Sequence, residues 1–178
     1  MPRMGQRLPV RRHAVTQPLN ESYRLIPLSR GQNALVDIID FEWLSQFNWS
    51  CGATEKQGLV AYRWNCGKQI TMHREIMKPS ENQAVDHINH NKLDNRRGNL
   101  RICTDSQNQC NRRRKPKNTS GYKGVSWYRS KNRWRAALNI KGKCVWTGLF
   151  KNKEEAAHAY DEAAKLHHGE FAYLNFPH

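Results

Sequence analysis

The feature that most constrains the fold is an alanine-rich segment, residues 153–168, that follows three strand-like runs. The runs cover residues 124–129, 133–140 and 143–150. Small side chains recur along the segment at Ala156, Ala157, Ala159, Ala163 and Ala164. A helix with so flat a side can lie close against a sheet. We therefore expect a three-stranded antiparallel sheet packed on one helix.

Turn and capping residues mark the limits of these elements. Short polar stretches at 130–132 and 141–142 are typical of hairpin turns. Asn152 is a suitable N-cap for the helix, Glu155 would complete a capping box, and Gly169 suits the C-terminal end.

The middle strand alternates between two kinds of side chain. Side chains two residues apart share one face of a sheet. The face expected toward the helix carries Trp134, Ala136, Leu138 and Ile140. The opposite face carries Arg133, Arg135, Ala137 and Asn139.

The N-terminal two-thirds of the chain is expected to form a second, mixed domain, which makes the fold class α+β. Apolar residues at helical spacing predict a short helix over residues 40–47. Residues 1–20 carry Arg and Pro with little apolar periodicity, so we expect them to be disordered. The expected strands of this domain cover residues 23–28, 34–39, 59–64 and 69–73, with Gly67 in the turn of the second pair.

The charge of the chain favours a polyanionic partner. Lys and Arg number 30 against 15 Asp and Glu, which gives a formal net charge of +15. Nucleic acid is the commonest partner of so basic a protein. An anionic membrane is the rival, but it predicts a Lys-rich amphipathic helix with a bulky apolar face, and the sequence contains none. The basic N-terminus has no apolar core of a secretory signal, so we expect a cytoplasmic protein that is not secreted.

The five cysteines do not form a recognisable metal or disulfide pattern. They are scattered, and no CxxC pair occurs. Reduced thiols are therefore expected, and zinc-ribbon or disulfide frameworks are disfavoured.

A basic stretch separates the two expected domains. Residues 113–120 contain a proline and end just before Gly121, which is typical of a linker. One interpretation is a solvated linker without further function. A linker between two DNA-binding modules would instead lie along phosphates, and we favour that role for Arg112, Arg113 and Arg114.

An acidic residue stands beside a histidine at Asp86-His87, and carboxamides follow at Asn99 and Asn108. Phosphodiester hydrolysis needs a base to deprotonate water and a cation to stabilise the charge that develops on phosphate. Neighbouring residues on a strand face opposite ways, so one can bind an ion while the other acts as base. Asp86 and a carboxamide from the following helix would supply oxygen ligands for such an ion.

The same segment resembles the HNH endonuclease family, and specifically its homing type with a ββα-metal motif. The resemblance lies in Asp86-His87-Ile88-Asn89, Asp94-Asn95-Arg96, Asn99-Leu100-Arg101 and Asn108, with an upstream strand expected at Met72-His73-Arg74. It implies that His87 is the general base, that Asp86 and Asn108 bind the metal, and that Asn99 braces the loop. The family's last histidine is an asparagine here, which should weaken metal binding. Asn111, one helical turn later, is a fallback ligand.

Two plainer interpretations apply to this segment. Asn and Asp clusters such as residues 89–95 are often only turns. His73 is expected to be a packing or surface residue, with a phosphate contact as the alternative.

Residues 120–177 resemble the APETALA2/ethylene-response-factor DNA-binding domain. The resemblance rests on Tyr122-Lys123-Gly124-Val125-Ser126-Trp127, on Trp146-Thr147-Gly148-Leu149-Phe150, and on the helix after them. It implies a sheet that enters the major groove with a helix behind it. The residues expected on the DNA face are Lys123, Gly124, Ser126, Tyr128, Arg135, Asn139, Cys144 and Trp146.

Roles on this face follow from side-chain chemistry. Arg135 and Asn139 can read base edges. Phosphate contacts are expected from Lys123, Arg129, Arg133 and Lys143. Core packing is the alternative for Trp146. Several base-reading arginines of the family are replaced here, so the plant family's preferred site is not transferred.

These observations predict a site-specific DNA endonuclease that uses one divalent metal ion, Mg²⁺ with Mn²⁺ as the alternative. The expected domains are the nuclease at 21–112, the linker at 113–120 and the DNA reader at 121–178. Double-stranded DNA is the expected partner, with neither membrane nor small-molecule substrate. A monomer that nicks is favoured, and the homing resemblance suggests a phage or other mobile element. The alternatives are a DNA-binding regulator with an inactive nuclease half and an RNA-directed protein, which the major-groove reader disfavours.

Overall fold

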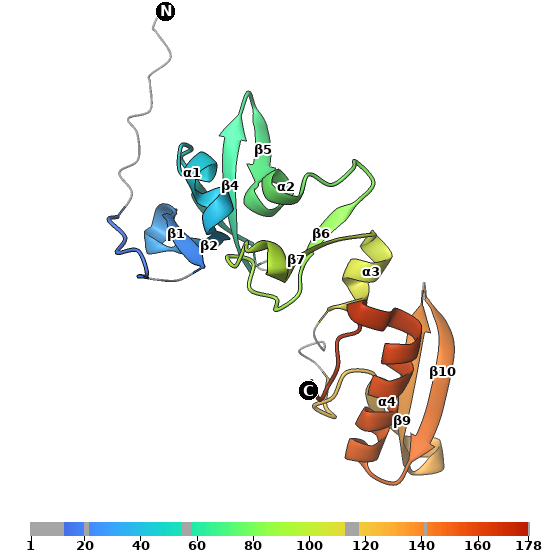
Figure 1. Cartoon of the computed structure of the whole chain (residues 1–178). Helices are drawn as coiled ribbons and strands as arrows, with labels where there is room; N and C mark the ends of the chain where they lie inside the picture. Colours follow the sequence, from blue (N-terminus) through green and yellow to red (C-terminus); the bar gives the residue numbers. More distant parts are fainter. Residues whose placement is uncertain (1–12, 20–21, 55–57, 113–117, 141, 178) are drawn as a thin grey trace, which may run out of the picture. The chain divides into compact units, whose positions relative to one another are not determined.

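The computed structural model describes residues 13–19, 22–54, 58–112, 118–140 and 142–177. The chain divides into two compact units, Met1–Ile102 and Cys103–His178, which are described separately (Figure 1). Both units mix helices with antiparallel strands, so the α+β class is confirmed. Within the described residues, no helix is both long and apolar enough to cross a membrane.

The first unit is built from short elements. The strands pair as β1 with β2, as β3-β4-β5, and as β6 with β7. The elements are β1 (Tyr23–Pro27), β2 (Asn33–Asp37), α1 (Ile38–Leu44), β3 (Ser50–Thr54), β4 (Gly58–Asn65), β5 (Lys68–Thr71), α2 (Met72–Met77), β6 (Ala84–His87) and β7 (Leu100–Cys103).

The core of the first unit joins these small sheets to the two helices. Trp49 is completely buried, and its indole N–H donates to the carbonyl of Leu44 at the end of α1 over 2.8 Å. Met72 and Ile76 bury one side of α2 in the same cluster. Because the described residues of this unit form no sheet of more than three strands, contacts between sheets and helices must supply most of the burial.

Two expected strands of this unit end earlier than predicted, and one strand was not predicted. The expected strand at 69–73 ends at Thr71, and Met72–Met77 forms helix α2 in place of a strand. Its apolar residues Met72 and Ile76 stand four apart, so a helix buries both on one side. The expected strand 34–39 likewise ends at Asp37, where α1 begins. Strand β3 was not expected, and it pairs antiparallel with β4.

The second unit contains the expected sheet and helix. Figure 1 shows α4 lying along one face of the sheet, whose strand order is β10-β9-β8. The elements are α3 (Asp105–Cys110), β8 (Val125–Tyr128), η3 (Arg129–Lys131), β9 (Arg133–Ile140), β10 (Lys143–Phe150), α4 (Lys153–His168) and η4 (Gly169–Phe171).

The residues of β9 that pack against α4 are those that the alternation of side chains in this strand predicted. Ala136 and Leu138 of β9 are buried beneath the helix. Four of the five alanines are buried as well, at Ala156, Ala157, Ala163 and Ala164. At the start of α4, the Asn152 side chain accepts a hydrogen bond from the Glu155 N–H over 2.7 Å, which is the first half of the expected capping box.

Hydrogen bonds hold the C-terminal segment around Asn175 against α4. The buried carboxylate of Asp161 in α4 accepts hydrogen bonds from the backbone N–H groups of Asn175 and Phe176, each over 2.9 Å. The Asn175 side chain in turn accepts from the Lys123 N–H over 2.6 Å. These bonds join α4 and the turn before β8 to the C-terminal segment.

Candidate functional site

Asp86 and His87 are the last two residues of β6, and both are almost buried, with 7% and 5% of their surfaces exposed. Directly after them, the Ile88 N–H donates to the carbonyl of Asn99 over 2.9 Å. Asn99 itself is the last residue of a short 3-10 turn, Arg97–Asn99, that leads into β7. The structure therefore places Asn99 beside the end of β6, next to the Asp-His pair.

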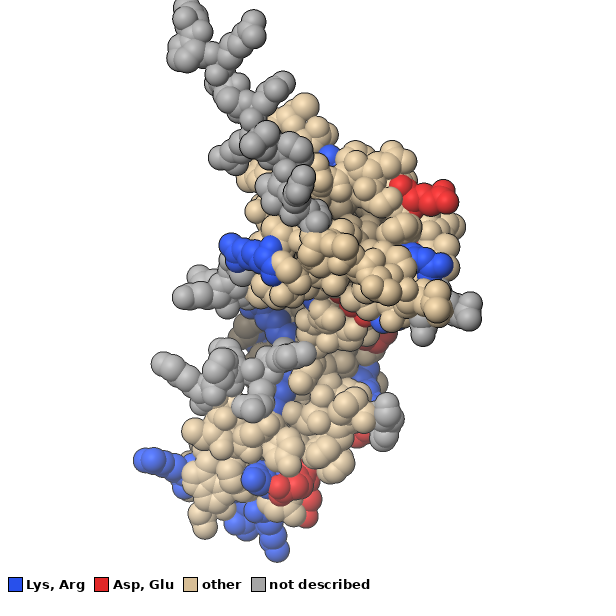
Figure 2. Space-filling view, turned by 90° about the vertical axis from the view of Figure 1, so that its left-hand side faces the viewer, with Lys and Arg blue, Asp and Glu red and all other residues tan. Residues whose placement is uncertain are grey.

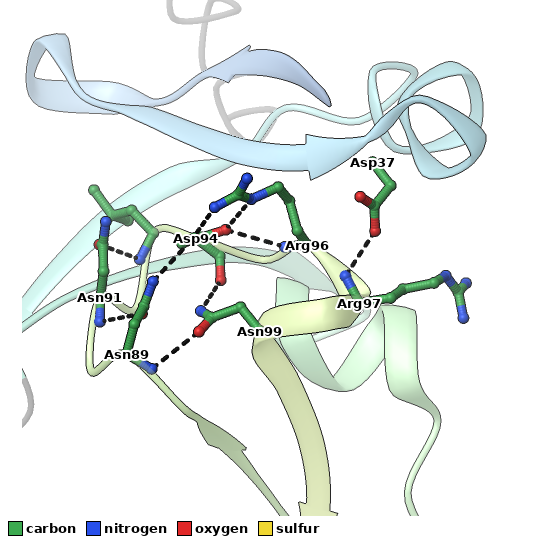
Figure 3. A network of polar contacts seen from close by, with 8 residues as sticks. Asp37, Asn89, Asn91, Asp94, Arg96, Arg97 and Asn99 are labelled. Atoms are coloured by element: carbon green, nitrogen blue, oxygen red, sulfur yellow. Dashed lines mark hydrogen bonds and ion pairs between the residues drawn. The ribbon is translucent and has the colours of Figure 1, made fainter. Parts of the chain in front are cut away.

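A network of carboxamides closes the loop between β6 and β7 (Figure 3). The Asn99 side chain accepts from the Asn89 N–H over 3.0 Å and donates to the Asp94 carbonyl over 2.8 Å. The Asn89 side chain donates to the Asp94 carboxylate over 2.9 Å. Asn99 thus makes the contacts that a loop-bracing residue requires.

Two ion pairs stabilise this loop, one within it and one that joins it to α1. The guanidinium of Arg96 donates two hydrogen bonds, of 2.8 and 2.7 Å, to the carboxylate of Asp94. Burial acts to raise the pKa of Asp94, but the hydrogen bonds from Arg96 and Asn89 outweigh it and hold that pKa below its ordinary value. Arg97 binds the buried Asp40 of α1 over 2.7 and 2.8 Å, and its backbone N–H donates to Asp37.

The imidazole of His87 sits in surroundings that keep it neutral. Burial lowers its pKa below the ordinary value, and a hydrogen bond with Asn95 acts in the opposite direction. The Nε2 atom lies 3.4 Å from the Oδ1 atom of the fully buried Asn95. A neutral imidazole near pH 7 can accept a proton from water, which is what a general base requires.

His73 packs against His87 from the start of α2. The two rings meet edge to face, with their centroids 5.1 Å apart. Burial, followed by the charges of His87, Lys92 and Arg74, lowers the pKa of His73 to about 3. This placement agrees with the packing role expected for His73.

Arg101 is a neighbour of Asp86 that sequence reasoning did not assign. Its Nε and one terminal nitrogen both donate to Oδ2 of Asp86, over 3.1 and 2.8 Å. Both side chains are nearly buried, with 11% and 8% exposed. Asp86 and Arg101 are fifteen residues apart in the sequence. The pairing of β6 with β7 brings them together, so their spacing in the sequence did not predict this ion pair.

Asn108 and the fallback ligand Asn111 belong to the second unit. Asn108 lies in α3, and Asn111 caps the end of that helix. Because Asp86 belongs to the first unit, the structure describes the two expected ligands separately. Among the residues that the structure describes, no group of three or more His, Cys, Asp or Glu gathers into a metal site. The start of α3 has a complete capping box between Thr104 and Gln107, a T-x-x-Q signal that the sequence analysis overlooked.

The sheet face away from α4 carries most of the side chains expected to meet DNA. Ser126 pairs with Arg135, and Tyr128 pairs with Arg133. Cys144 pairs with Asn139 on the neighbouring strand. Exposed residues on this face and its edge include Ser126, Tyr128, Arg129, Arg135, Asn139, Lys143 and Cys144, with Arg133 half-buried.

Trp146 differs from its expected placement because of an irregularity in β10. The register shifts between Cys144 and Trp146, so one strand has an extra residue there. A bulge of this kind turns the following side chain to the other face. Trp146 consequently pairs with the buried Leu138 and packs against the core beneath α4, which corresponds to the alternative interpretation of core packing.

Lys123 also differs from its expected placement. Its Nζ atom donates to the carbonyl of Cys110 at the end of α3 over 2.6 Å and lies 5.2 Å from the centre of the Tyr173 ring. Burial lowers the pKa of Lys123 to about 8. A Cβ at Gly124 would overlap the ring of the buried Tyr160, so the backbone of this turn lies close over the core. The turn that carries Lys123 is held inward, so its amine points into the unit.

Cations are spread over the surface of both units. Figure 2 shows more Lys and Arg than Asp and Glu side chains on the face in view. Arg112 is exposed after α3. Arg113 and Arg114, for which phosphate contacts were expected, lie outside the described residues.

Comparison with known proteins gives two family matches. The HNH endonuclease family profile matches residues 78–110, and the AP2 domain profile matches residues 120–169. No solved structure is significantly similar to the chain.

Several curated proteins are similar to one or both parts. An uncharacterized HNH endonuclease of Acanthamoeba polyphaga mimivirus is 32% identical over 160 residues, covering 86% of this chain and 80% of that protein. Protein 3.8 of Escherichia phage T7 is 34% identical over 91 residues, 49% of this chain and 72% of its own. An ethylene-responsive transcription factor of Arabidopsis thaliana is 38% identical over 69 residues, 33% of this chain but only 16% of that factor.

Proposed function

This chain belongs to the HNH endonuclease family and carries a C-terminal AP2 domain, and from that premise we propose that it is a metal-dependent, site-specific DNA endonuclease. The observation that carries the proposal is the end of β6. There a neutral, nearly buried His87 stands beside the carboxylate of Asp86. The loop that follows is braced by Asn99. A base, an anionic ligand and a rigid loop are the parts that hydrolysis of a phosphodiester requires.

His87 would take a proton from the water molecule that attacks phosphorus. A new P–O bond forms, the bond to the leaving sugar oxygen breaks, and that oxygen takes a proton from solvent. A bound divalent cation would supply the positive charge that stabilises the phosphorane-like transition state and the leaving oxyanion. The residues fit a hard cation such as Mg²⁺, because the carboxylate of Asp86 and the carboxamide of Asn108 are both oxygen donors. Mn²⁺ prefers similar ligands and is the alternative.

The AP2 domain would select the site. Arg135 and Asn139 on the outer sheet face are exposed and can bond to base edges in the major groove. Arg129, Arg133 and Lys143 would hold phosphates at its margins. Trp146 and Lys123 are no longer part of this proposed face, since both side chains turn into the unit.

The finer features of the activity follow the homing type. One candidate site per chain favours nicking by a monomer, and dimerisation would convert the nick into a double-strand break. Its relatives in a mimivirus and a phage support an origin in a virus or other mobile element.

Incubation with supercoiled plasmid tests the proposal. Purified protein should nick or linearise the plasmid with Mg²⁺ or Mn²⁺ and leave it intact in the presence of EDTA. His87→Ala should abolish cleavage while binding of duplex DNA in a mobility-shift assay is retained. His167→Ala, an exposed histidine of α4, is the matched control and should cleave like the wild type.

A DNA-binding regulator with an inactive nuclease half is the second candidate. The ion pair between Arg101 and Asp86 favours it, because a guanidinium already neutralises the carboxylate expected to bind metal. Tight duplex binding without cleavage under either metal would establish the regulator and end the nuclease proposal.

A further inference from the structure

A fully buried carboxamide lies beside the ring of the expected base. Asn95 has no exposed surface, and its Oδ1 atom lies 3.4 Å from Nε2 of His87. A neutral imidazole has one N–H donor and one acceptor nitrogen, and a carbonyl oxygen can only accept. With the amide oxygen of Asn95 facing the ring, Nε2 is the nitrogen that donates to it and carries the ring proton.

The backbone of Asn95 is held from a distant part of the sequence. Its N–H donates to the carbonyl of Leu35 in β2 over 2.8 Å, and the Leu35 N–H donates to the carbonyl of Leu93 over the same distance. Leu35 and Asp94 form an isolated parallel bridge. Strand β2 thus fixes the loop on which Asn95 stands, although β2 lies outside the segment that matches the HNH family.

The amide nitrogen of Asn95 makes no compensating bond. Within the described residues, its Nδ2 atom is buried and has no hydrogen-bond partner. A buried donor without a hydrogen-bond partner lowers the stability of the folded protein, so stability alone does not explain an asparagine at position 95. What the side chain does contribute is the oxygen that faces His87.

The ring of His87 is restrained on another side by His73. The edge-to-face contact, with ring planes 78° apart, limits rotation of the imidazole. Together with the Asn95 oxygen, it restricts both the orientation and the proton position of the ring.

We propose that Asn95 is a positioning residue that holds His87 in its Nε2–H tautomer, so that Nδ1 is the nitrogen that receives the proton from water. This inference rests on the proposed role of His87 as general base. Asn95 acts through His87 and does not itself touch the substrate.

The direct test is the ¹⁵N NMR spectrum of the full-length protein, labelled in its histidine rings, at a pH where His87 is neutral. The protonated and unprotonated ring nitrogens have well-separated shifts, and the His87 signals are those lost in His87→Ala. We expect the Nε2–H tautomer in the wild type. An Nδ1–H tautomer there would mean that the Asn95 amide is turned the other way, and it would overturn the proposal.

Two substitutions of Asn95 separate its oxygen from its packing. Asn95→Asp keeps an oxygen acceptor and replaces the partnerless amide with a carboxylate, whose negative charge also favours a proton on Nε2, so the Nε2–H signal should persist. Asn95→Leu keeps a similar volume without an acceptor, and should give a mixture of tautomers. Where Asn95→Leu does not fold, the Asp variant decides, because loss of its Nε2–H signal contradicts the proposal.

Cleavage kinetics provide the second readout. Asn95→Leu should lower kcat roughly 10- to 100-fold with KM for DNA unchanged, and Asn95→Asp should recover most of that loss. Asn89→Leu is the matched control, because it breaks the same loop network at Asp94 without touching His87 and should leave the tautomer unchanged. A wild-type kcat and tautomer in Asn95→Leu would refute the assignment. If the wild type cleaves no DNA, the nuclease proposal fails while the NMR result still decides the role of Asn95.

Discussion

Two nearly buried charges face each other at the end of β6, where the guanidinium of Arg101 meets the carboxylate of Asp86. Removing a carboxylate from water is unfavourable unless an opposite charge replaces its hydration. Arg101 provides that charge in the absence of metal. If Asp86 also binds a divalent cation, the cation and Arg101 stabilise the same group. The stability of the protein should then depend on both.

Replacing Arg101 tests this relation. Arg101→Met should destabilise the metal-free protein by about 3 kcal/mol, because it removes both guanidinium contacts from a nearly buried carboxylate. Added Mn²⁺ should raise the Tm of Arg101→Met more than that of the wild type, since the cation then supplies the missing charge. Thermal unfolding with and without metal measures both effects, with Lys68→Met as the control for loss of an exposed cation from the same unit. Equal metal-induced shifts in Tm would remove Asp86 as a ligand.

His73 predicts how stability depends on pH. Its pKa is lowered from 6.5 to about 3 in the folded protein, chiefly by burial. Between these values the unfolded chain binds a proton that the folded protein does not, so stability falls as the pH drops from above 6.5 toward 3. Each such proton contributes a slope of at most about 1.4 kcal/mol per pH unit. His73→Gln should flatten the loss of stability on the acid side.

Urea unfolding at pH 7.5 and pH 5.0 measures this slope. The exposed His167→Gln is the control and should keep the wild-type dependence on pH. An unchanged slope in His73→Gln would show that His73 is not the group that resists protonation.

At the scale of single elements, the sequence correctly predicted those strands and helices whose formation depends on local periodicity. The sheet and helix of the second unit follow from alternation in β9 and from the alanines of α4. Helix α2 and the bulge in β10 were missed for a shared reason. The structure of each depends on which side chains the rest of its unit can bury. In α2 these are Met72 and Ile76, and in β10 it is Trp146. The pairing of Asp86 with Arg101 was missed because it arises only when β6 meets β7.

The turn before β8 provides a test of how α4 packs on its sheet. Gly124 has a φ of +76°, and a Cβ at this position would overlap the ring of Tyr160 in α4. Gly121 has a φ of +86° with nothing within 4 Å. Both Gly→Ala substitutions should cost about 1 kcal/mol because of the positive φ. Gly124→Ala should cost roughly 1–3 kcal/mol more, because Tyr160 must move out of the core.

Urea unfolding of the two glycine variants measures the difference, with DNA binding as a second readout. Gly121→Ala should bind duplex DNA like the wild type, and Gly124→Ala should bind more weakly as the sheet loses its support. Equal losses of stability in the two variants would mean that Tyr160 does not pack against this turn.

For the whole molecule, the boundary between family matches and the boundary between compact units do not coincide. The HNH match ends at residue 110 and includes α3, whereas the compact units divide between Ile102 and Cys103. Helix α3 is therefore grouped with the AP2 domain. Lys123 reaches back to the last carbonyl of α3, where a cation also interacts favourably with the helix dipole. An element that the family assigns to the nuclease is thus held by the DNA-binding domain.

The attachment of α3 to the second unit predicts the local stability of that helix. A six-residue helix is marginal without tertiary contacts, so its hydrogen bonds should open easily once Lys123 is lost. In Lys123→Met, backbone amides of residues 108–110 should exchange with deuterium roughly tenfold faster than in the wild type, which corresponds to about 1.4 kcal/mol of local stability. Hydrogen exchange of the full-length protein measures this directly. Lys131→Met, which removes an exposed cation from η3, should leave exchange in α3 unchanged. If α3 exchanges alike in both variants, Lys123 does not hold the helix. If exchange rises only in Lys123→Met, the helix that carries Asn108 owes part of its order to the AP2 domain.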